Sequence, residues 1–261
     1  MGDPNPRTYV VTGSASGIGA ATAELLASRG HRVLDVDRHG ASITADLATE
    51  SGRADMVAAV TAASGGAIDA IVANAGVSEP DELCIRVNYF GAVATLEGLR
   101  PLLAGSSAPR AVATASSSVM NVHEPALVDA CLAGDEAAAL AAGAGTGYLA
   151  YPSSKRALAR WIRRTAPTAD WAGAGIGLNA VAPGVVQTAM TAGLLADETM
   201  RPIVDQAVPM PYGGYAEPGH IAQLIAFLAS PESARITGQV IFIDAGADTV
   251  LRGDDIFGPP V

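Results

Sequence analysis

The segment TGSASGIG, residues 12–19, decides the fold of this chain. It follows a β-branched run, Thr8 to Thr12, and precedes an Ala/Leu-rich stretch of helical period that includes residues 24–29. Glycines let a backbone turn sharply and approach an anion closely, and the N–H groups that begin a helix attract phosphate. The segment therefore predicts a strand, a phosphate-binding turn and a helix. A tight turn without a ligand is the alternative, since a glycine-rich turn alone is a weak signal.

The same alternation continues along the chain, and Gly30 is expected to end the first helix. Further strands are expected at residues 32–36, 68–73, 110–115, 175–181 and 239–243, with helices around residues 50–63, 84–103, 152–166 and 217–229. Alternating strands and helices are typical of βαβ units around a buried parallel sheet. We expect an α/β fold, a Rossmann-type doubly wound parallel sheet of about seven strands. No repeat or linker divides residues 1–261, so one domain is predicted.

Composition narrows the class of protein. Hydrophobic residues make up 49% and charged residues 16% of the 261 residues, which indicates a compact globule. The formal net charge of -10 disfavours nucleic acid as a partner. No apolar run reaches the roughly 18 residues of a membrane span, and the N-terminal residues show no export signal. The two cysteines, Cys84 and Cys131, are far apart, so a reducing, cytoplasmic location is expected.

Two segments interrupt the alternation. Residues 124–147 are rich in alanine, end in closely spaced glycines and predict a helical insertion before the helix that begins near residue 152. Residues 188–218 carry many apolar side chains, among them Met190, and are too long for a simple connection. Long excursions of this kind tend to be lids or binding loops. We expect the second segment to be a substrate lid, with ordinary packing over a ligand as the alternative.

An acidic residue follows the second predicted strand. Asp37 lies 20 residues beyond Gly17, where a dinucleotide fold places an acid on the adenosine ribose. A carboxylate there accepts hydrogen bonds from the ribose hydroxyls and repels a 2′-phosphate, so NAD (as NADH when reduced) is favoured and NADP is less favoured. Arg38 next to it offers a phosphate a partner and softens that discrimination.

The glycine spacing departs from the common GxGxxG fingerprint and fits TGxxxGxG, which resembles the short-chain dehydrogenase/reductase family. Other motifs occur in the order typical of that family: Asn74-Ala75-Gly76, Val87-Asn88, Tyr151-Pro-Ser-Ser-Lys155 and Pro183-Gly184-Val-Val-Gln-Thr188. The likeness covers roughly residues 7–247. The resemblance implies a nicotinamide-dependent oxidoreductase.

The spacing of Tyr151 and Lys155 carries a mechanism of its own. Four residues apart on a helix, the two side chains share one face, and Pro152 suits the first turn, which would place the phenol at the positive end of the helix. Lowering a tyrosine pKa from about 10 to about 7 takes roughly 4 kcal/mol of phenolate stabilisation. Lys155, the cationic nicotinamide and the helix N-terminus could share that task.

The resemblance assigns roles to further residues. It implies that Tyr151 is the general acid/base, that a serine after the fifth strand binds the substrate oxygen, and that Asn88 supports Lys155 through an ordered water. Residues 116–118 are all serine. Ser118 fits the family's Ser-x-x-Gly pattern best, although Asn121 replaces the glycine, and Ser117 is the alternative.

The resemblance also implies a set of cofactor-binding residues. In this set Asp46 and Leu47 contact adenine, and the loop from Pro183 to Thr188 lies beneath the nicotinamide. The full set is Gly13, Ser16, Gly17, Ile18, Gly19, Asp37, Asp46, Leu47, Asn74, Ala75, Gly76, Tyr151, Lys155, Pro183, Gly184, Val186 and Thr188.

Other chemistries find little support. The four histidines have no metal-ligand spacing, so no metal site is predicted, and no GxSxG elbow of a serine hydrolase is present. His123 follows the serine run closely, and one hypothesis places it at the substrate mouth.

The function expected from these residues is NAD-dependent interconversion of a hydrophobic secondary alcohol and ketone, or of an alcohol and aldehyde. Ser118 and Tyr151 are 33 positions apart because the insertion lies between them. Together with Val33-Leu-Asp-Val-Asp37, Asp46-Leu47, Val87-Asn-Tyr-Phe-Gly91 and Leu149-Ala-Tyr-Pro-Ser-Ser-Lys155, this spacing resembles the 3α-hydroxysteroid dehydrogenase/carbonyl reductase branch, with coniferyl-type aromatic alcohol dehydrogenases nearby. An NAD-binding regulatory or structural protein without turnover is the alternative. We expect the insertion to cover the Tyr/Lys helix and leave a homodimer through the C-terminal helix and strand, with a tetramer as the alternative.

Overall fold

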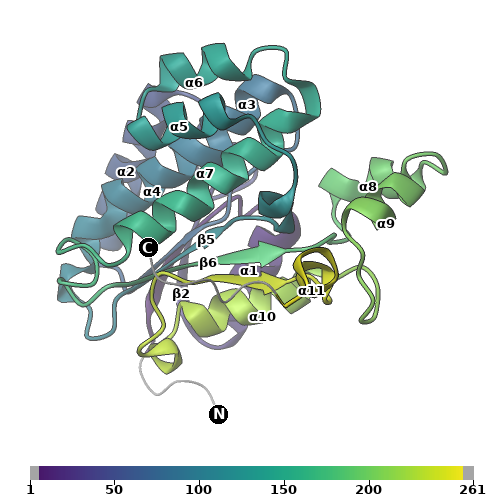
Figure 1. Cartoon of the computed structure of the whole chain (residues 1–261). Helices are drawn as coiled ribbons and strands as arrows, with labels where there is room; N and C mark the ends of the chain where they lie inside the picture. The colour runs from purple at the N-terminus through teal and green to yellow at the C-terminus, as the bar shows by residue number, and fades with distance from the viewer. Residues whose placement is uncertain (1–5, 255–261) are drawn as a thin grey trace.

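A computed structural model describes residues 6–254, and it contains one seven-stranded sheet in the order β3-β2-β1-β4-β5-β6-β7, parallel throughout (Figure 1). The strands are β1 (Thr8–Thr12), β2 (Arg32–Asp37), β3 (Ile43–Thr44), β4 (Ala70–Ala73), β5 (Arg110–Thr114), β6 (Gly177–Pro183) and β7 (Val240–Ile243). The order reverses direction between β1 and β4, which is the switch point where such sheets bind ligands. The predicted fold class is confirmed.

Helices cover both faces of the sheet, because successive strand residues point to opposite sides. Tyr9 and Val11 pack in one buried cluster with α1 (Gly17–Ser28) and α10 (Pro218–Leu228). Val10 lies in a second cluster, to which α2 (Glu50–Ser64), α4 (Ala92–Leu99) and α7 (Ala150–Thr165) contribute. Figure 1 shows these two layers above and below the sheet. Both faces of the central strands β1, β4, β5 and β6 are therefore buried, which explains why these four sequences are largely apolar without alternation.

The structure differs from the sequence prediction in two places. The seventh strand, β3, has only two residues and lies outside the ranges in which the sequence predicts strands. The helix expected around residues 84–103 is four pieces: α3 (Asp81–Ile85), a π-helix (Arg86–Gly91), α4 and a 3-10 helix (Arg100–Gly105). Pro101 lies in the first turn of the 3-10 helix, where its missing N–H does not interrupt the hydrogen bonding.

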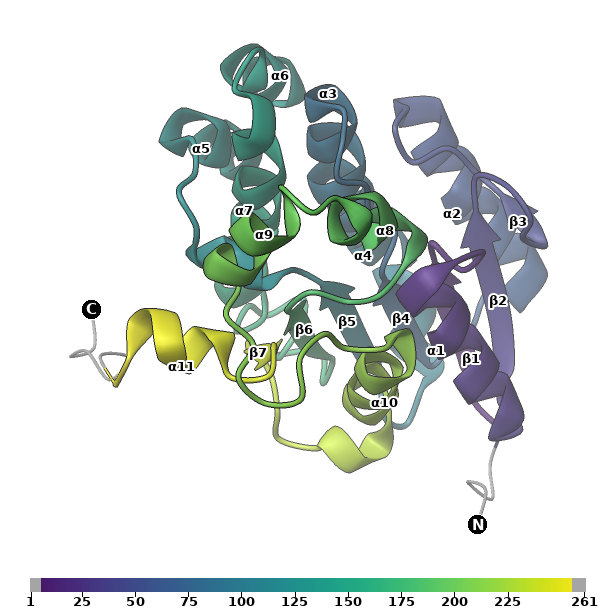
Figure 2. The ribbon, with the colours of Figure 1, turned by 90° about the vertical axis from the view of Figure 1, so that its right-hand side faces the viewer.

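Residues 124–147 contain two helices that pack on the body of the molecule. These are α5 (Pro125–Ala133) and α6 (Glu136–Gly143), joined at Gly134, whose φ of 75° suits glycine. Leu127, Val128 and Cys131 are fully buried in the same cluster as α7. Figure 2 shows α5 and α6 beside α7 and α3, so the insertion covers the Tyr/Lys helix.

Residues 188–218 carry α8 (Ala189–Ala196) and α9 (Arg201–Ala207), neither of which has a buried residue. Figure 1 shows both helices projecting beyond the carboxyl ends of the strands. The two stems of this segment are joined by a parallel bridge between Val186 and Ala216. The chain then continues through α10 and β7 to α11 (Ala247–Arg252). Among residues 6–254, no helix has the length and apolar character needed to cross a membrane.

Candidate active site

The glycine turn between β1 and α1 has no room for side chains. A Cβ on Gly13, whose φ is +69°, would lie 2.8 Å from Ala75 Cα, and a Cβ on Gly19 would lie 1.9 Å from the Gly13 carbonyl oxygen. Ser16 is the N-cap of α1, yet its side chain caps none of the first-turn N–H groups. The turn therefore leaves the positive end of a twelve-residue helix available to an anion.

A pocket of about 510 Å³ extends along the carboxyl ends of the strands from Asp37 to Tyr151. Of the seventeen residues expected to bind cofactor, all except Gly19 line it. Gly19 instead provides the close packing of α1 on the turn. Asn88, Ser117, Ser118 and His123, which the sequence had also singled out, are not among the lining residues.

The acid at the end of β2 is joined to the glycine turn. Asp37 accepts a hydrogen bond from the Ala15 N–H at 3.0 Å, and both Asp37 and the adjacent Arg38 line the pocket. Asp46 accepts one from the Ala48 N–H at 2.9 Å, and Leu47 beside it is buried. One end of the pocket thus offers carboxylate oxygens and an apolar wall, the surface that an adenosine requires.

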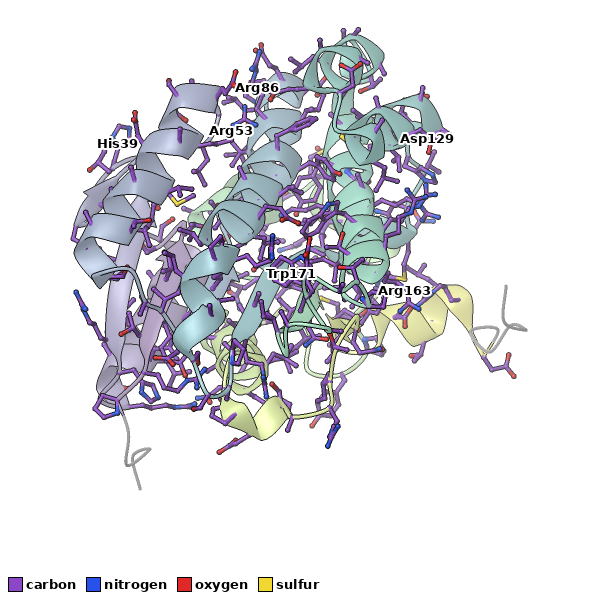
Figure 3. The ribbon with its side chains drawn as sticks, turned by 90° about the vertical axis from the view of Figure 1, so that its left-hand side faces the viewer. His39, Arg53, Arg86, Asp129, Arg163 and Trp171 are labelled. Atoms are coloured by element: carbon purple, nitrogen blue, oxygen red, sulfur yellow. The ribbon has the colours of Figure 1, made fainter. Side chains whose placement is uncertain are left out.

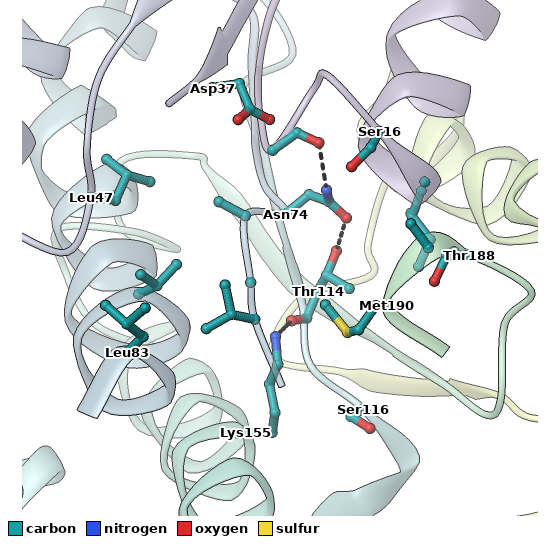
Figure 4. A pocket seen from close by; sticks show the side chains of 18 of the residues that line it. Ser16, Asp37, Leu47, Asn74, Leu83, Thr114, Ser116, Lys155, Thr188 and Met190 are labelled. Carbon is teal, nitrogen blue, oxygen red and sulfur yellow. Dashed lines mark hydrogen bonds between the residues drawn. The ribbon is translucent and has the colours of Figure 1, made fainter. Parts of the chain in front are cut away.

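A chain of hydrogen bonds connects the glycine turn to the other end of the pocket (Figure 4). The Asn74 amide donates to the Gly13 carbonyl at 3.5 Å, the upper bond drawn in Figure 4, and to the Thr12 carbonyl at 3.2 Å. The Thr114 hydroxyl donates to Asn74 Oδ1 at 3.0 Å. Lys155 Nζ donates to the Thr114 carbonyl at 2.8 Å. The sequence does not predict a role for Thr114, because its backbone carbonyl accepts the Lys155 hydrogen bond and any residue type has such a carbonyl.

Tyr151 and Lys155 meet in the pocket as their spacing predicts. Tyr151 is the second residue of α7, and Lys155 Nζ lies 6.0 Å from the centre of its ring. Burial lowers the pKa of Lys155 to about 8. Burial also raises the pKa of Tyr151, a change that a hydrogen bond with Ser116 opposes. Burial of the phenol thus opposes the lowered Tyr151 pKa that the sequence predicts with a nicotinamide bound.

The serine that reaches the pocket is Ser116. It lines the pocket and hydrogen-bonds Tyr151, whereas Ser118 Oγ is buried without a hydrogen-bond partner and does not line the pocket. The physical reason is local: Ser116 is the N-cap of a 3-10 helix, Ser117–Met120, and accepts the Ser118 N–H at 3.1 Å. The chain turns away from the pocket after residue 116. The structure thus differs from the expectation of Ser118 or Ser117 at this position.

Asn88 lies behind Lys155 and not in the pocket wall. Its amide exchanges hydrogen bonds with the backbone of Val77, at 2.8 and 2.9 Å, and donates to Ser154 Oγ at 3.2 Å. Asn88 Oδ1 and Lys155 Nζ would each be 3.1 Å from a Cβ on Gly76, so glycine there lets the two polar groups come together. His123 lies apart from the pocket lining, with Nδ1 facing the Asn121 carbonyl at 3.4 Å.

The loop after β6 completes the pocket wall. A Cβ on Gly184 would lie 2.9 Å from Asp244 Cα, and Val185 donates its N–H to Met210 Sδ at 3.3 Å. Val186, Thr188 and Met190 line the pocket here. The closed glycine turn, the ribose-type acid and the phenol at the far end together fit a nicotinamide dinucleotide.

Comparisons with known proteins agree with this geometry. A family model described as enoyl-(acyl carrier protein) reductase matches residues 13–248. The chain is 38% identical over 254 residues to the 3-alpha-hydroxysteroid dehydrogenase/carbonyl reductase of Comamonas testosteroni, covering 93% of this chain and 97% of that protein. It is 34% identical over 262 residues to the cis-4-hydroxycyclohexanecarboxylate dehydrogenase of Sinomonas cyclohexanicum, covering 94% and 97%.

A solved structure is similar over nearly the whole chain. The crystal structure of the 3-alpha-hydroxysteroid dehydrogenase from Pseudomonas sp. B-0831 complexed with NADH superposes with a TM-score of 0.90 at 41% sequence identity. The match covers 95% of this chain and 100% of the other.

Proposed function

The chain belongs to the short-chain dehydrogenase/reductase family of oxidoreductases, and from that membership we propose that it interconverts a hydrophobic secondary alcohol and ketone, or an alcohol and aldehyde, with NAD(H). The observation that carries the proposal is the single pocket that joins Asp37 at one end to Tyr151 and Lys155 at the other. The activity we favour is that of a hydroxysteroid dehydrogenase/carbonyl reductase, the activity named for two of the relatives.

The pocket would hold the cofactor through groups already in position. The N–H groups at the start of α1 would bind the pyrophosphate, Asp37 would accept hydrogen bonds from the ribose hydroxyls, and the Val186 backbone would hold the carboxamide. Asp37 favours NADH over NADPH, because its carboxylate repels a 2′-phosphate. The similarity to a dehydrogenase crystallised with NADH supports this preference.

Three side chains take part in transferring a proton to the substrate oxygen. When bound, NADH supplies hydride to the substrate carbonyl carbon. Ser116 donates a hydrogen bond to the carbonyl oxygen, and Tyr151, protonated at neutral pH, gives that oxygen its proton. Lys155, whose pKa burial lowers to about 8, is placed to stabilise the phenolate that remains.

The segment 188–218 is proposed as the substrate lid. Met190 lines the pocket, and Met190, Leu194 and Ile203 are exposed on the two lid helices. Apolar side chains without buried partners beside a pocket suit an apolar substrate, and a thioether adapts to varied shapes.

A homodimer is the proposed assembly, and the cytoplasm the proposed location. The insertion covers α7, whereas Val250 and Leu251 on α11 are exposed and β7 is half-buried at the edge of the sheet. Light scattering tests the assembly: a mass of two chains is expected, and a tetramer that resists dilution contradicts it.

Turnover of NADH with a panel of 3-ketosteroids, quinones and aromatic aldehydes tests the function. We expect reduction of at least one ketone, a preference for NADH over NADPH, and a loss of about a hundredfold in kcat for Ser116→Ala. Ser118→Ala is the matched control, and its kcat should stay within about threefold of wild type. Tight NADH binding without reduction of any carbonyl would instead favour a regulatory protein.

A further inference from the structure

An ion cluster joins the insertion to the wall of the pocket. Glu136, the first residue of α6, contacts Arg53 of α2 at 2.7 Å through Oε2 and Arg86 of the π-helix at 2.8 Å through Oε1. Arg86 also contacts Glu82 at 2.9 Å. Figure 3 shows Arg53 and Arg86 close together at the upper end of the molecule. One carboxylate from the insertion therefore holds two guanidinium groups from two other helices.

Burial makes this carboxylate hard to replace. The side chain of Arg53 is 10% exposed and that of Glu136 is 26% exposed. Arg53 additionally donates from Nε to the Thr49 carbonyl at 3.1 Å, which fixes its direction. Removing the Glu136 charge leaves the buried Arg53 without a carboxylate partner, whereas Arg86 keeps the exposed Glu82. We expect Arg86, the more exposed of the two, to move away.

The same cluster holds the π-helix along its length. Arg86 is its first residue, and the Arg53 guanidinium lies 5.9 Å from the ring centre of Phe90, four residues later. At its end, a Cβ on Gly91 would lie 3.0 Å from Leu47 Cβ. A π-helix is rare and less favourable than an α-helix, so its surroundings must hold it in place. The Arg53, Glu136 and Arg86 contacts are made at residues that do not line the pocket.

The π-helix matters because it carries Asn88 and Val87. Val87 lines the pocket, and Asn88 bonds Val77 and Ser154 beside Lys155 Nζ. Relaxation to α-helical hydrogen bonding would shift the register by one residue, or about 100° around the axis. This rotation would move the Asn88 side chain away from Val77 and Ser154. The geometry of the insertion is thereby connected to the surroundings of Lys155.

We propose that Glu136 is a positioning residue, which holds the π-helix through Arg86 and Arg53 and so fixes Asn88 beside Lys155. This inference rests on the proposed function only where it concerns catalysis. It assigns the insertion a task inside the active site in addition to covering α7.

Steady-state kinetics of Glu136→Gln test the catalytic part. We expect kcat to fall about tenfold with the KM for NADH within twofold of wild type, because the pyrophosphate and ribose contacts are untouched. In an Asn88→Ala background the same substitution should have no further effect on kcat, since both act on one arrangement. Asp129→Asn is the matched control: it breaks the exposed pair of the insertion with Arg160 at 3.6 Å and should leave kcat unchanged.

Hydrogen exchange tests the structural part without turnover. Amides 86–91 should exchange at least about tenfold faster in Glu136→Gln than in wild type and Asp129→Asn. Arg86→Gln, which keeps the Arg53–Glu136 pair, should reproduce both effects if Glu136→Gln does not fold. Unchanged exchange at 86–91, or a kcat within twofold of wild type in both variants, overturns the proposal. If wild type reduces no carbonyl, the proposed function fails, and the exchange comparison alone decides for or against the role of Glu136.

Discussion

The part of the pocket that runs from the glycine turn to Lys155 and the 188–218 segment differ in how tightly their residues are packed. At the cofactor end a Cβ on Gly13 or Gly19 would collide with backbone, and hydrogen bonds link Thr12, Asn74 and Thr114 to Lys155. In the 188–218 segment neither helix has a buried residue, and a Cβ on Gly193 would meet nothing within 4 Å.

This contrast indicates which region sets the binding specificity for each ligand. A dinucleotide meets a surface already in place, so its binding geometry should change little with the substrate. The substrate meets a segment held mainly at its stems, by the Val186–Ala216 bridge and by a hydrogen bond from Gln187 to Glu217 at 2.8 Å. Substitutions should therefore have large effects at the packed end and small ones in the lid.

The largest effect is expected at the catalytic group of the packed end. Tyr151→Phe removes the hydroxyl that carries the proton, and kcat should fall by about a thousandfold while NADH affinity stays within threefold. Stopped-flow measurement of NADH oxidation and fluorescence titration of NADH give the two values. Turnover at the wild-type rate would contradict the proposed role of Tyr151.

The pH dependence of stability probes the burial of Lys155. Burial lowers the pKa of Lys155 from 10.5 in the unfolded chain to about 8 in the folded one. Between these pH values the unfolded state binds more protons, so stability rises with pH. The free energy of unfolding of the apoprotein, relative to Lys155→Met, should rise by up to about 3 kcal/mol from pH 8 to pH 10.5. A difference that does not change with pH argues against a buried ammonium.

A pair of glycine substitutions compares the two regions directly. Gly19→Ala places a Cβ 1.9 Å from the Gly13 carbonyl oxygen and should weaken NADH binding by up to about a hundredfold. Gly193→Ala, inside α8, should leave the Kd within twofold and should favour the helix by about 0.5–1 kcal/mol. Calorimetry gives both affinities. Equal losses in the two variants would remove the distinction between a packed and an open region.

The smallest effect is expected in the lid. Met190→Ala shortens an apolar side chain that lines the pocket, and the KM for a ketosteroid should rise by about threefold to tenfold with the KM for NADH unchanged. Glu198→Gln, at an exposed position between α8 and α9, serves as the control. A rise in the NADH KM equal to that for the steroid would place Met190 at the cofactor instead.

The features that could be predicted from the sequence are those that depend on residues close together in the chain. The strand and helix on either side of residues 12–19 and the four-residue spacing of Tyr151 and Lys155 depend on short-range geometry, and the structure places them as predicted. The π-helix could not be predicted, because its hydrogen bonds leave no periodic pattern. Which of the three serines lines the pocket depends on where the chain passes from β5 to the 3-10 helix, and the sequence pattern does not fix that position.

Transfer of deuterium from C4-deuterated NADH to a ketosteroid, followed by mass spectrometry of the product, tests whether Tyr151 assists hydride transfer. With each C4 epimer supplied in turn, wild type should place deuterium on the carbinol carbon from one epimer only, and Tyr151→Phe should yield about a thousandfold less product in the same time. A labelled product formed equally by both proteins, or oxidation of NADH with no deuterium in the alcohol from either epimer, would contradict hydride transfer assisted by Tyr151.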